Sequence, residues 1–501
     1  MFNILQGVRH RLMAGVLLLL VMVACQGLSS AQASGSAIAS TQNQPLIDTA
    51  TLATGFYVAT DGNDNNPGTL SEPFASLRRA QQAMRDSSSI KTTYIRAGTY
   101  KPKPGVGCNN GAGASVYLTV TDNGETWSYY PPDGYNSAIL DGQSTVGNSG
   151  GTGGNGTGCA FSTDNASNIT IVGLQFKNYL YAAFSADVGS NVKFLSNVIH
   201  NTTAAAWGAG AIATICTPGI LVKNNYLYDL AYDGIMLTAG PSCPHGISND
   251  VVSRNVILNS CTWPAVHGFG NDQNGGDCGA IYLHDGTSLS TNVQIVNNYI
   301  RDVNKSSKGA GDYGTNGTVG CCADGVYTDT GTHHVTIKGN IIAGMLSTCV
   351  QENDPEYNVI TGNICDLASD SGYQSIVIYG RGKVWPTSMT GDVFEHNIVI
   401  SASTGSGAGF DGATRTPTPM SISDNAYYNY VGSTIKSTGN VYVGSDTDPV
   451  YENPQLSGWE YHIATGSPVF NSRVLFPGIT GGWGPPGFVI PHSGTPPSCP
   501  H

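Results

Sequence analysis

An asparagine recurs along the chain at the end of short alternating segments, and this repeat constrains the fold more than any other feature. It occurs at Asn197, Asn225, Asn255, Asn298, Asn340, Asn363, Asn397 and Asn425, with spacings of 28, 30, 43, 42, 23, 34 and 28 residues. A base repeat of about 23 residues with added loops predicts one solenoid coil per asparagine. Asparagines at the same bend of successive coils can exchange amide hydrogen bonds and tolerate left-handed backbone angles.

A second alternating segment follows each asparagine and supplies an aliphatic ladder. Its members are Ile235, Ile281, Val326, Val350 and Ile376. Successive side chains of a strand point to opposite faces, so these residues are expected to point inward and their neighbours outward. The outward neighbours are Met236, Tyr282, Tyr327 and Gln351. The pattern predicts an all-β, right-handed parallel β-helix, a single-stranded solenoid whose crossover connections set its hand.

Composition agrees with short strands and many turns. The chain has 65 glycines among 501 residues, and only 11% of its residues are charged. The formal net charge is -12, and no basic stripe is present, so nucleic-acid binding is not expected. One long repeat domain accounts for the length, because stacked coils bury a continuous core. We expect a monomer.

The N-terminus has the pattern of a bacterial export signal. Basic residues from Arg9 to Arg11 precede an apolar run, Leu12 to Ala24, that is short for a membrane span. Two cleavage sites compete: a lipobox ending at Cys25, which would add a lipid anchor, and Ala31-Gln-Ala-Ser34 for ordinary signal peptidase. Either predicts a secreted or cell-envelope protein, attached to membrane only through an anchor at Cys25.

The remaining chain divides into four further parts. After the signal peptide (1–34) we expect a linker (35–54), an N-terminal cap with the first coils (55–130), a parallel β-helix catalytic domain (131–475) and a Pro- and Gly-rich irregular tail (476–501). The cap should contain a helix over Ala75–Asp86, with apolar residues at helical spacing, and a strand over Tyr94–Tyr100. It would cover the open end of the stack and protect its edge strand.

Cysteine usage indicates disulfides rather than a metal site. Eleven cysteines follow Cys25, and export permits disulfide bonds. There is no CxxC pair, so no zinc site is predicted. Cys349 and Cys365 are expected to be buried in coils, and Cys321-Cys322 to staple a long loop. Their connectivity cannot be deduced from the spacing.

The opening block contains Asp61-Gly-Asn-Asp-Asn-Asn-Pro-Gly-Thr, Glu72-Pro-Phe-Ala-Ser-Leu and Ile95-Arg-Ala-Gly-Thr-Tyr. With these motifs it resembles the N-terminal cap of secreted β-helix carbohydrate enzymes of the pectate-lyase-like superfamily. The segment Trp459–Phe470 is similar to the closing Gly-Ser-Pro motif of these enzymes. The resemblance covers roughly residues 55–470 and implies the fold and activity on carbohydrate.

Two motifs most resemble β-helix glycoside hydrolases of the fucosidase/xylanase type. They are Asp277-Cys-Gly-Ala-Ile-Tyr and Gly325-Val-Tyr-Thr-Asp-Thr-Gly-Thr. The resemblance implies that Asp277 and Asp329 occupy the family's acidic positions. The second motif departs from the family's Tyr-Leu-Asp-Asp, because threonines flank Asp329. No sugar specificity is transferred.

Carboxylates gather around the second segment of each repeat. Glycoside hydrolysis requires a pair of such carboxyl groups. One carboxyl must be protonated and one ionised, about 5–5.5 Å apart for retention or 6.5–9.5 Å for inversion. Asp277 and Asp329 are the leading catalytic pair, and Asp324 is the first substitute. The expected substrate-binding residues are Asp233, Tyr282, His284, Asp285, Tyr327, Glu352 and Arg381. Any one of these aspartates can equally be a structural residue at a bend.

Two alternatives to a hydrolase remain open. A uronate lyase or epimerase would need Ca²⁺ or basic side chains such as Arg381 and Lys383 to neutralise the substrate carboxylate. A non-catalytic surface β-helix could bind glycans without converging acids. For the hydrolase no cofactor or metal is expected, and Ca²⁺ enters only for a lyase. The predicted partner is a polysaccharide or oligosaccharide.

Overall fold

The computed structural model describes most of the chain after the predicted leader and linker. The described residues are 52–102, 108, 113–145, 156–203, 210–262, 278–303, 323–345, 348–353, 355–367, 377–379, 390–401, 410–412, 420–431, 435, 445–471 and 474–491. The predicted signal peptide, Cys25 and all but the end of the linker lie outside them. Within these ranges no helix is long and apolar enough to cross a membrane.

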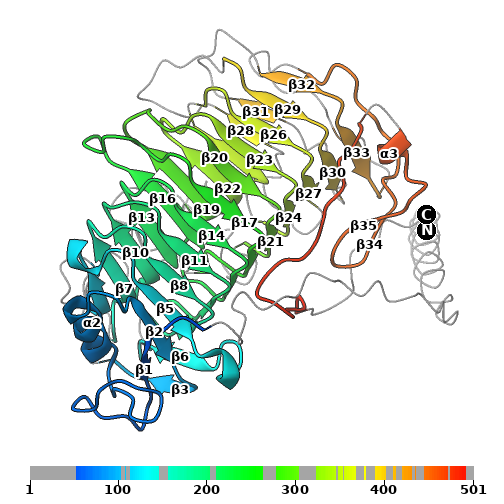
Figure 1. Ribbon diagram of the computed structural model, residues 1–501. Coiled ribbons are helices and arrows are strands. Elements are labelled where there is room, and N and C mark those ends of the chain that lie inside the picture. Colours follow the sequence, from blue (N-terminus) through cyan, green and yellow to red (C-terminus); the bar gives the residue numbers. More distant parts are fainter. Residues whose placement is uncertain are drawn as a thin grey trace, which may run out of the picture. The chain divides into compact units, whose positions relative to one another are not determined.

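Three long parallel sheets form the body of the protein (Figure 1). The twelve-stranded sheet contains, in order, β1 (Phe56–Val58), β2 (Thr92–Ile95), β5 (Thr126–Tyr129), β8 (Thr170–Val172), β11 (Lys193–Leu195), β14 (Leu221–Lys223), β17 (Val251–Ser253), β20 (Val293–Val296), β23 (Val335–Lys338), β26 (Val359–Thr361), β29 (Val393–Glu395) and β32 (Ser421–Ser423). The predicted repeat segments that end in asparagine are the strands of this sheet.

The eleven-stranded sheet follows the asparagines. It contains β3 (Gly98–Tyr100), β6 (Ala138–Asp141), β9 (Gln175–Lys177), β12 (Val198–His200), β15 (Tyr226–Tyr228), β18 (Val256–Leu258), β21 (Tyr299–Arg301), β24 (Ile341–Ala343), β27 (Ile364–Asp366), β30 (Ile398–Ser401) and β33 (Ala426–Asn429). The apolar pairs after each asparagine are therefore strands of their own. The sequence did not reveal them as strands, because mostly three-residue segments are too short to display a period.

The ten-stranded sheet contains the second segments of the sequence repeat. In order it has β31 (Phe410–Gly412), β28 (Val377–Tyr379), β25 (Val350–Glu352), β22 (Ala323–Asp329), β19 (Cys278–Asp285), β16 (Ile235–Ala239), β13 (Ile212–Ile215), β10 (Ala182–Asp187), β7 (Cys159–Asp164) and β4 (Ala114–Leu118). Each coil thus contributes one strand to each sheet. The predicted parallel β-helix is confirmed.

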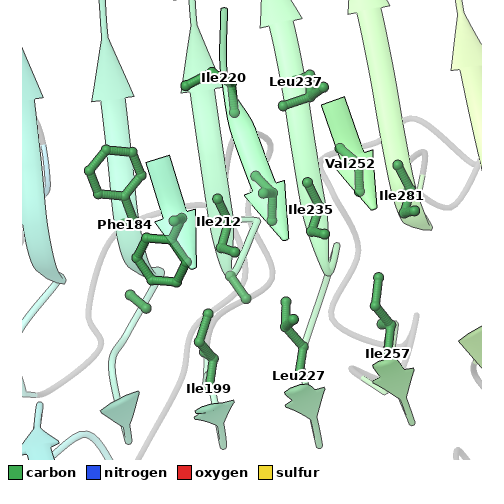
Figure 2. Close-up of a cluster of buried hydrophobic side chains, with 14 of the residues drawn as sticks. Phe184, Ile199, Ile212, Ile220, Leu227, Ile235, Leu237, Val252, Ile257 and Ile281 are labelled. Carbon is green, nitrogen blue, oxygen red and sulfur yellow. The ribbon is translucent and has the colours of Figure 1, made fainter. Parts of the chain in front are cut away.

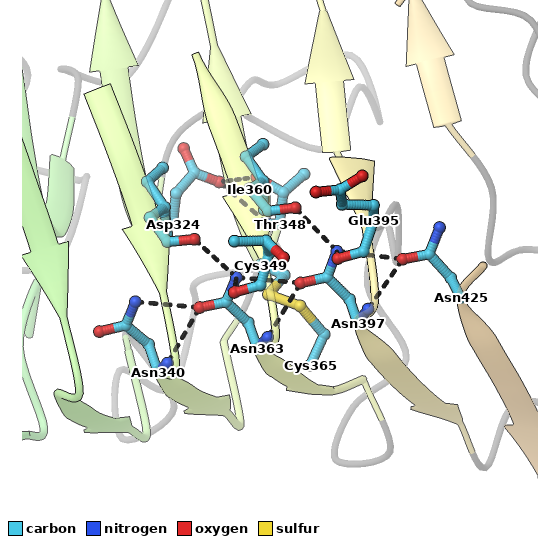
Figure 3. Close-up of a disulfide and its surroundings, with 12 residues drawn as sticks. Asp324, Asn340, Thr348, Cys349, Ile360, Asn363, Cys365, Glu395, Asn397 and Asn425 are labelled. Atoms are coloured by element: carbon cyan, nitrogen blue, oxygen red, sulfur yellow. Dashed lines mark hydrogen bonds between the residues drawn. A yellow bond between two sulfur atoms is a disulfide. The ribbon is translucent and has the colours of Figure 1, made fainter. Parts of the chain in front are cut away.

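The asparagine ladder is confirmed along its whole length. Asn298 donates its backbone N–H (2.8 Å) and its Nδ2 (3.0 Å) to Oδ1 of Asn340, and its Nδ2 also donates to the carbonyl of Val252. The same pair of bonds joins each predicted asparagine to the next, from Asn197 to Asn425 (Figure 3 shows the last four). All of them are fully buried, and the ladder ends at Asp446, which accepts from Asn425.

The predicted aliphatic ladder lines the interior. Ile235, Ile281, Val326 and Val350 belong to the main core together with residues of the other two sheets (Figure 2 shows Ile235 and Ile281). Ile376 lies outside the described residues. The neighbours Met236, Tyr282 and Tyr327 form a separate cluster with Ala213, as expected of side chains on the opposite face of the sheet. The direction of these side chains is therefore as predicted.

The N-terminal cap closes the first coil with helix α2 (Leu77–Asp86), whose apolar residues at helical spacing, Leu77, Ala80, Ala83 and Met84, are buried. Its side chains satisfy the free edge of β4. Arg78 donates to the carbonyls of Ala114 and Ser115, and Gln81 donates to that of Tyr117 at 2.6 Å. Short 3-10 turns follow at Val120–Asp122 (η2) and Pro131–Asp133 (η3). The predicted strand over 94–100 is divided between two sheets, because the chain bends after β2.

The C-terminal segment packs along the outer face of the eleven-stranded sheet (Figure 1, red). After the antiparallel pair β34 (Leu456–Ser457) and β35 (His462–Ile463) comes α3 (Pro468–Asn471), and residues 474–491 then run back along the coils. Trp483 contacts Tyr299 (5.5 Å between ring centroids) and Phe488 contacts Tyr226 (4.4 Å). Residues 476–491, the described part of the predicted irregular tail, contain no strands, as predicted, but their packing was not foreseen.

Four disulfides join described cysteines. They are Cys108–Cys159, Cys216–Cys243, Cys261–Cys278 and Cys349–Cys365 (Figure 3 shows the last). Cys349 and Cys365 are fully buried in the coils, as predicted. The Cys321-Cys322 pair lies outside the described residues.

Exchanging one ladder amide for a carboxylate should cost substantial stability. In Asn298→Asp, a carboxylate oxygen replaces the Nδ2 group that donates to Oδ1 of Asn340 and to the carbonyl of Val252. The substitution also introduces an uncompensated buried charge. We expect the free energy of unfolding to fall by about 3 kcal/mol or more. Denaturant titration at pH 7 measures this change.

The matched control is Asn292→Asp. The Nδ2 group of Asn292 donates to Oδ1 of Asn249 in an exposed pair that joins the coils of Asn298 and Asn255. We expect a change within about 0.5 kcal/mol there. Equal losses at the two positions would contradict the role assigned to the buried ladder.

Candidate functional site

Two outward columns cross the ten-stranded sheet at right angles to its strands. The aromatic column consists of Tyr117, Ser162, Ser185, Ala213, Met236, Tyr282, Tyr327 and Gln351. The acidic column consists of Asp164, Asp187, Ile215, Thr238, His284 and Asp329. Neighbouring members lie on adjacent strands, about 4.8 Å apart. Carboxylates and aromatic rings are thus brought onto one face from segments far apart in the chain.

Asp329 stands at the centre of a hydrogen-bonded group. Its Oδ2 accepts from the hydroxyl of Tyr282 at 2.7 Å. Its Oδ1 accepts from Nδ2 of Asn353 at 2.8 Å and from the backbone N–H of Thr330 at 2.7 Å. Nδ2 of Asn353 also donates to the Tyr327 hydroxyl at 3.0 Å. Both carboxylate oxygens are therefore held in fixed positions.

Three predicted site residues surround this carboxylate. Tyr282 and Tyr327 pack edge to face, with ring centroids 5.2 Å apart and planes at 82°. Their side chains are buried, with 2% and 1% of their surface exposed, and they contact Met236. The rings therefore support Asp329 rather than present open faces for stacking. His284 is half-buried and is the register partner of Asp329 on the adjacent strand.

Asp233 and Asp324 share one position two coils apart, as predicted, but they lie at the other end of the strands. Asp233 accepts from the N–H of Gly279 at 2.8 Å, and Asp324 accepts from the N–H and hydroxyl of Thr348 at 2.9 and 2.6 Å (Figure 3 shows the Asp324 contacts). Both are buried and bond to the next coil. Five residues of extended strand separate Asp324 from Asp329, or roughly 17 Å along the strand.

Asp277 lies outside the described residues, so its pairing with Asp329 stays a prediction. Among the described acids, Asp233 and Asp324 lie at one end of the strands of the ten-stranded sheet and Asp329 lies at the other.

The remaining predicted residues have other surroundings. Asp285 is buried, and its Oδ1 accepts from the N–H and hydroxyl of Thr287 in the turn after β19. Glu352 is fully buried on the inner side of β25, where its Oε1 accepts from Nδ2 of Asn358 at 3.3 Å. Arg381 lies outside the described residues.

Sequence reasoning missed the pair Asp164 and Asp187, register partners on β7 and β10. Asp164 accepts from the hydroxyl of Tyr117 at 3.0 Å and from Nδ2 of Asn165 at 2.6 Å. Burial, and then the charge of Asp164, raises the pKa of Asp187. A repeated motif could have revealed the pair, because Phe-Ser-Thr-Asp164 and Phe-Ser-Ala-Asp187 recur 23 residues apart.

One described group has ligand atoms close enough for a metal ion, namely Asp233, Cys261 and Cys278, within 4.8 Å of one another. Its two cysteines form a disulfide, so their sulfurs are not available as thiolate ligands. The group does not fit a metal centre. Ca²⁺ binding, predicted only for a lyase, finds no support in this group.

A second ladder of buried side chains, two acids and one amide, lies where the chain enters the twelve-stranded sheet. Oδ1 of Asp250 accepts from the N–H of Ile220, Oδ1 of Asn358 from that of Val335, and Oδ1 of Asp392 from that of Asn358, at 2.8–2.9 Å. Burial, and then the charge of Glu352, raises the pKa of Asp392 from 3.8 to about 8. Burial raises the pKa of Asp250 to about 7.

Comparison with known proteins gives distant structural similarities. No family model and no curated protein matches this chain. Similar solved structures include XylC in complex with xylose (12% identity, 82% of this chain and 88% of the other, TM-score 0.47), the A-module of the Azotobacter vinelandii mannuronan C-5 epimerase AlgE6 (13%, 79% and 100%, 0.43) and the Streptococcus pneumoniae surface protein and adhesin PfbA (12%, 75% and 84%, 0.41). At these values the similarities carry no argument about activity.

Replacing Asp392 by asparagine should improve stability at alkaline pH. In the folded protein Asp392 keeps its proton up to about pH 8, whereas the unfolded chain releases it near pH 4. Stability is therefore lost as pH rises between these values, by up to about 1.4 kcal/mol per pH unit. Asn358 shows that the ladder position accepts an amide.

Denaturant titrations at pH 5, 7 and 9 measure the effect. Asp392→Asn should flatten the decline relative to the wild type, and Asp448→Asn, at an exposed site, should leave it unchanged. A decline that is equally steep in Asp392→Asn would contradict the assignment.

Proposed function

We propose that this protein is a glycoside hydrolase that binds a polysaccharide along the outer face of the ten-stranded sheet. The observation that carries the proposal is the acidic column, in which Asp329 is held by the hydroxyl of Tyr282 from the neighbouring aromatic column. Acids are needed on both sides of a glycosidic bond. The face is roughly 40 Å long across its strands, which suits an extended glycan chain. The four disulfides support a location in an oxidising compartment outside the cytoplasm.

Asp329 is the carboxylate that we assign to the reaction. Hydrogen bonds from Tyr282, Asn353 and Thr330 hold its two oxygens, so little reorganisation is needed when charge develops on the sugar. His284 lies on the adjacent strand, where it can orient a sugar hydroxyl. The second carboxyl must come from another segment, and Asp277 remains the residue that sequence resemblance assigns to it.

The pair Asp164 and Asp187 is a second location for the same chemistry. Adjacent parallel strands are about 4.8 Å apart, close to the 5–5.5 Å between the carboxyls of retaining enzymes. The raised pKa of Asp187 suits a general acid. Asp164 accepts hydrogen bonds from Tyr117 and Asn165 and suits the nucleophile. Substitution distinguishes the two locations.

Hydrolysis is favoured over lyase action by the charges near Asp329. A lyase needs a cation to neutralise the uronate carboxylate and a base to remove the proton. Within the described part of the chain, no Lys or Arg side chain forms an ion pair or hydrogen bond with Asp329. Arg381, the predicted cation, lies outside that part, so the lyase remains the alternative to test.

Asp329→Asn should abolish hydrolysis in a folded protein. We expect a loss of at least about 1,000-fold in kcat/KM, because the substitution removes the charge but keeps the shape. Asp187→Asn, in the same outward column, is the matched control and should lose less than about tenfold. Initial rates of reducing-sugar release measure both, with circular dichroism to verify folding.

If Asp187→Asn abolished hydrolysis and Asp329→Asn did not, the catalytic site would be assigned to Asp164 and Asp187 on β7 and β10. Asp277→Asn tests the second carboxyl in the same assay. If Asp329→Asn, Asp277→Asn and Asp187→Asn all retained full hydrolysis, the assignment of the reaction to these carboxylates would be abandoned. If the wild type released no reducing sugar from any polysaccharide, the hydrolase proposal itself would be abandoned.

A polysaccharide panel with two readouts separates the classes of activity. Reducing-sugar release without ultraviolet absorbance, unaffected by EDTA, is the result expected of the hydrolase. Unsaturated products that absorb in the ultraviolet, lost on adding EDTA, would indicate a Ca²⁺-assisted lyase. Binding to a glycan without any product would indicate a non-catalytic surface protein.

A further inference from the structure

The N-terminal cap contains a pocket that the proposed reaction does not use. It has a volume of about 440 Å³ and lies between helix α2, the end of β3 and strand β4. This volume falls within the range of about 300–1,000 Å³ typical of small-molecule sites. The buried side chains of Tyr100, Leu140 and Tyr179, with that of Ser115, are among its lining.

Two cationic side chains line the pocket, and no acidic side chain does. They are Arg78 and Lys101. Arg78 donates through Nε and Nη2 to the carbonyls of Ser115 and Ala114, at 3.2 and 3.1 Å. These neutral acceptors hold the guanidinium in place without neutralising it. Among the ion pairs of the described residues, none includes Arg78 or Lys101. In a chain of net charge -12, such a lining is unusual.

Acids near the pocket do not line it. Asp64 accepts from the N–H groups of Ala75 and Ser76 and from the Ser76 hydroxyl, at 2.8–3.0 Å. Asp141, which follows Leu140, lies 3.7 Å from Nζ of Lys177. Burial and, to a smaller extent, the charges of Asp133 and Asp61 raise the pKa of Tyr100, which lines the pocket. The charged side chains of the lining itself are both cationic.

We propose that this pocket binds a sugar acid, a hydroxylated ring that carries a carboxylate. Arg78 and Lys101 match the carboxylate. Hydroxyl groups of Thr60, Thr99 and Ser115 offer partners for ring hydroxyls, and the aromatic and aliphatic lining suits the apolar face of a sugar. The choice of a saccharide over other carboxylates rests on the proposed function.

The pocket is separate from Asp329, the carboxylate assigned to the reaction, although β4 adjoins β7, which carries Asp164, and the next strand, β10, carries Asp187. Ser115 lies on β4, and Asp329 lies on β22, six strands further along the ten-stranded sheet. At about 4.8 Å per strand this is roughly 29 Å. The site would therefore anchor an acidic unit or branch of a polysaccharide away from the bond that is cleaved.

Calorimetric titration of the full chain with D-galacturonate, D-galactose and acetate tests the proposal. We expect galacturonate to bind at least tenfold more tightly than the other two. Lys101→Met and Arg78→Gln should each weaken galacturonate binding at least tenfold. Lys193→Met, at an exposed lysine of β11 that does not line the pocket, should leave it unchanged.

Three results would overturn the site. If galactose bound as tightly as galacturonate, the carboxylate would have no role in binding. If acetate bound as tightly as galacturonate, the pocket would be a site for any small anion. If none of the three bound, the pocket would not be a binding site for sugar acids or for small anions. Arg78→Gln also loosens the β4 edge, so Lys101→Met decides the test if that variant unfolds. Asp329→Asn should bind galacturonate like the wild type, which separates failure here from failure of the hydrolase proposal.

Discussion

The buried asparagine ladder is the interaction on which the rest of the structure depends. From Asn225 onward, each amide accepts two hydrogen bonds from the preceding coil and donates to it and to the next, as Asn298 does. A bend that would otherwise bury unpaired polar groups is thereby satisfied in every coil. Because the bonds pass directly from one asparagine to the next, a slip of one residue would break the whole series. The ladder therefore sets the register of all three sheets.

Register in turn decides which side chains share a face. Once Asn298 lies over Asn340, Tyr282 lies beside Tyr327 and His284 beside Asp329. The outer face of the eleven-stranded sheet is covered by residues 474–491, and the edge strand β4 is covered by α2. The ten-stranded sheet is the one whose outward columns combine carboxylates with aromatic rings, which is why the proposed function is placed there.

The acids of this chain have different roles because of where each lies along its strand. Asp233 and Asp324 come at the beginning of their segments and bond to the backbone of the next coil. Asp329 comes at the end of β22 on the outward side, where side-chain hydroxyl and amide groups surround it. Asp392 is buried, and burial favours its protonated form. The residue type is the same in every case, but the direction of the side chain and its distance from water differ.

The sequence by itself determined the coil repeat, the asparagine ladder, the inward aliphatic column, the cap helix and the outward direction of Tyr282 and Tyr327. These features follow from the spacing of apolar residues and asparagines, which can be recognised in the sequence alone. Only the tertiary structure decided that Asp324 and Asp329 lie at opposite ends of β22, that Asp164 and Asp187 are neighbours, and that residues 474–491 cover one sheet. The ends of a strand and the packing of an irregular segment leave no period in the sequence. The Phe-Ser-x-Asp repeat of Asp164 and Asp187 identifies neighbours only once the coil is known to have 23 residues there.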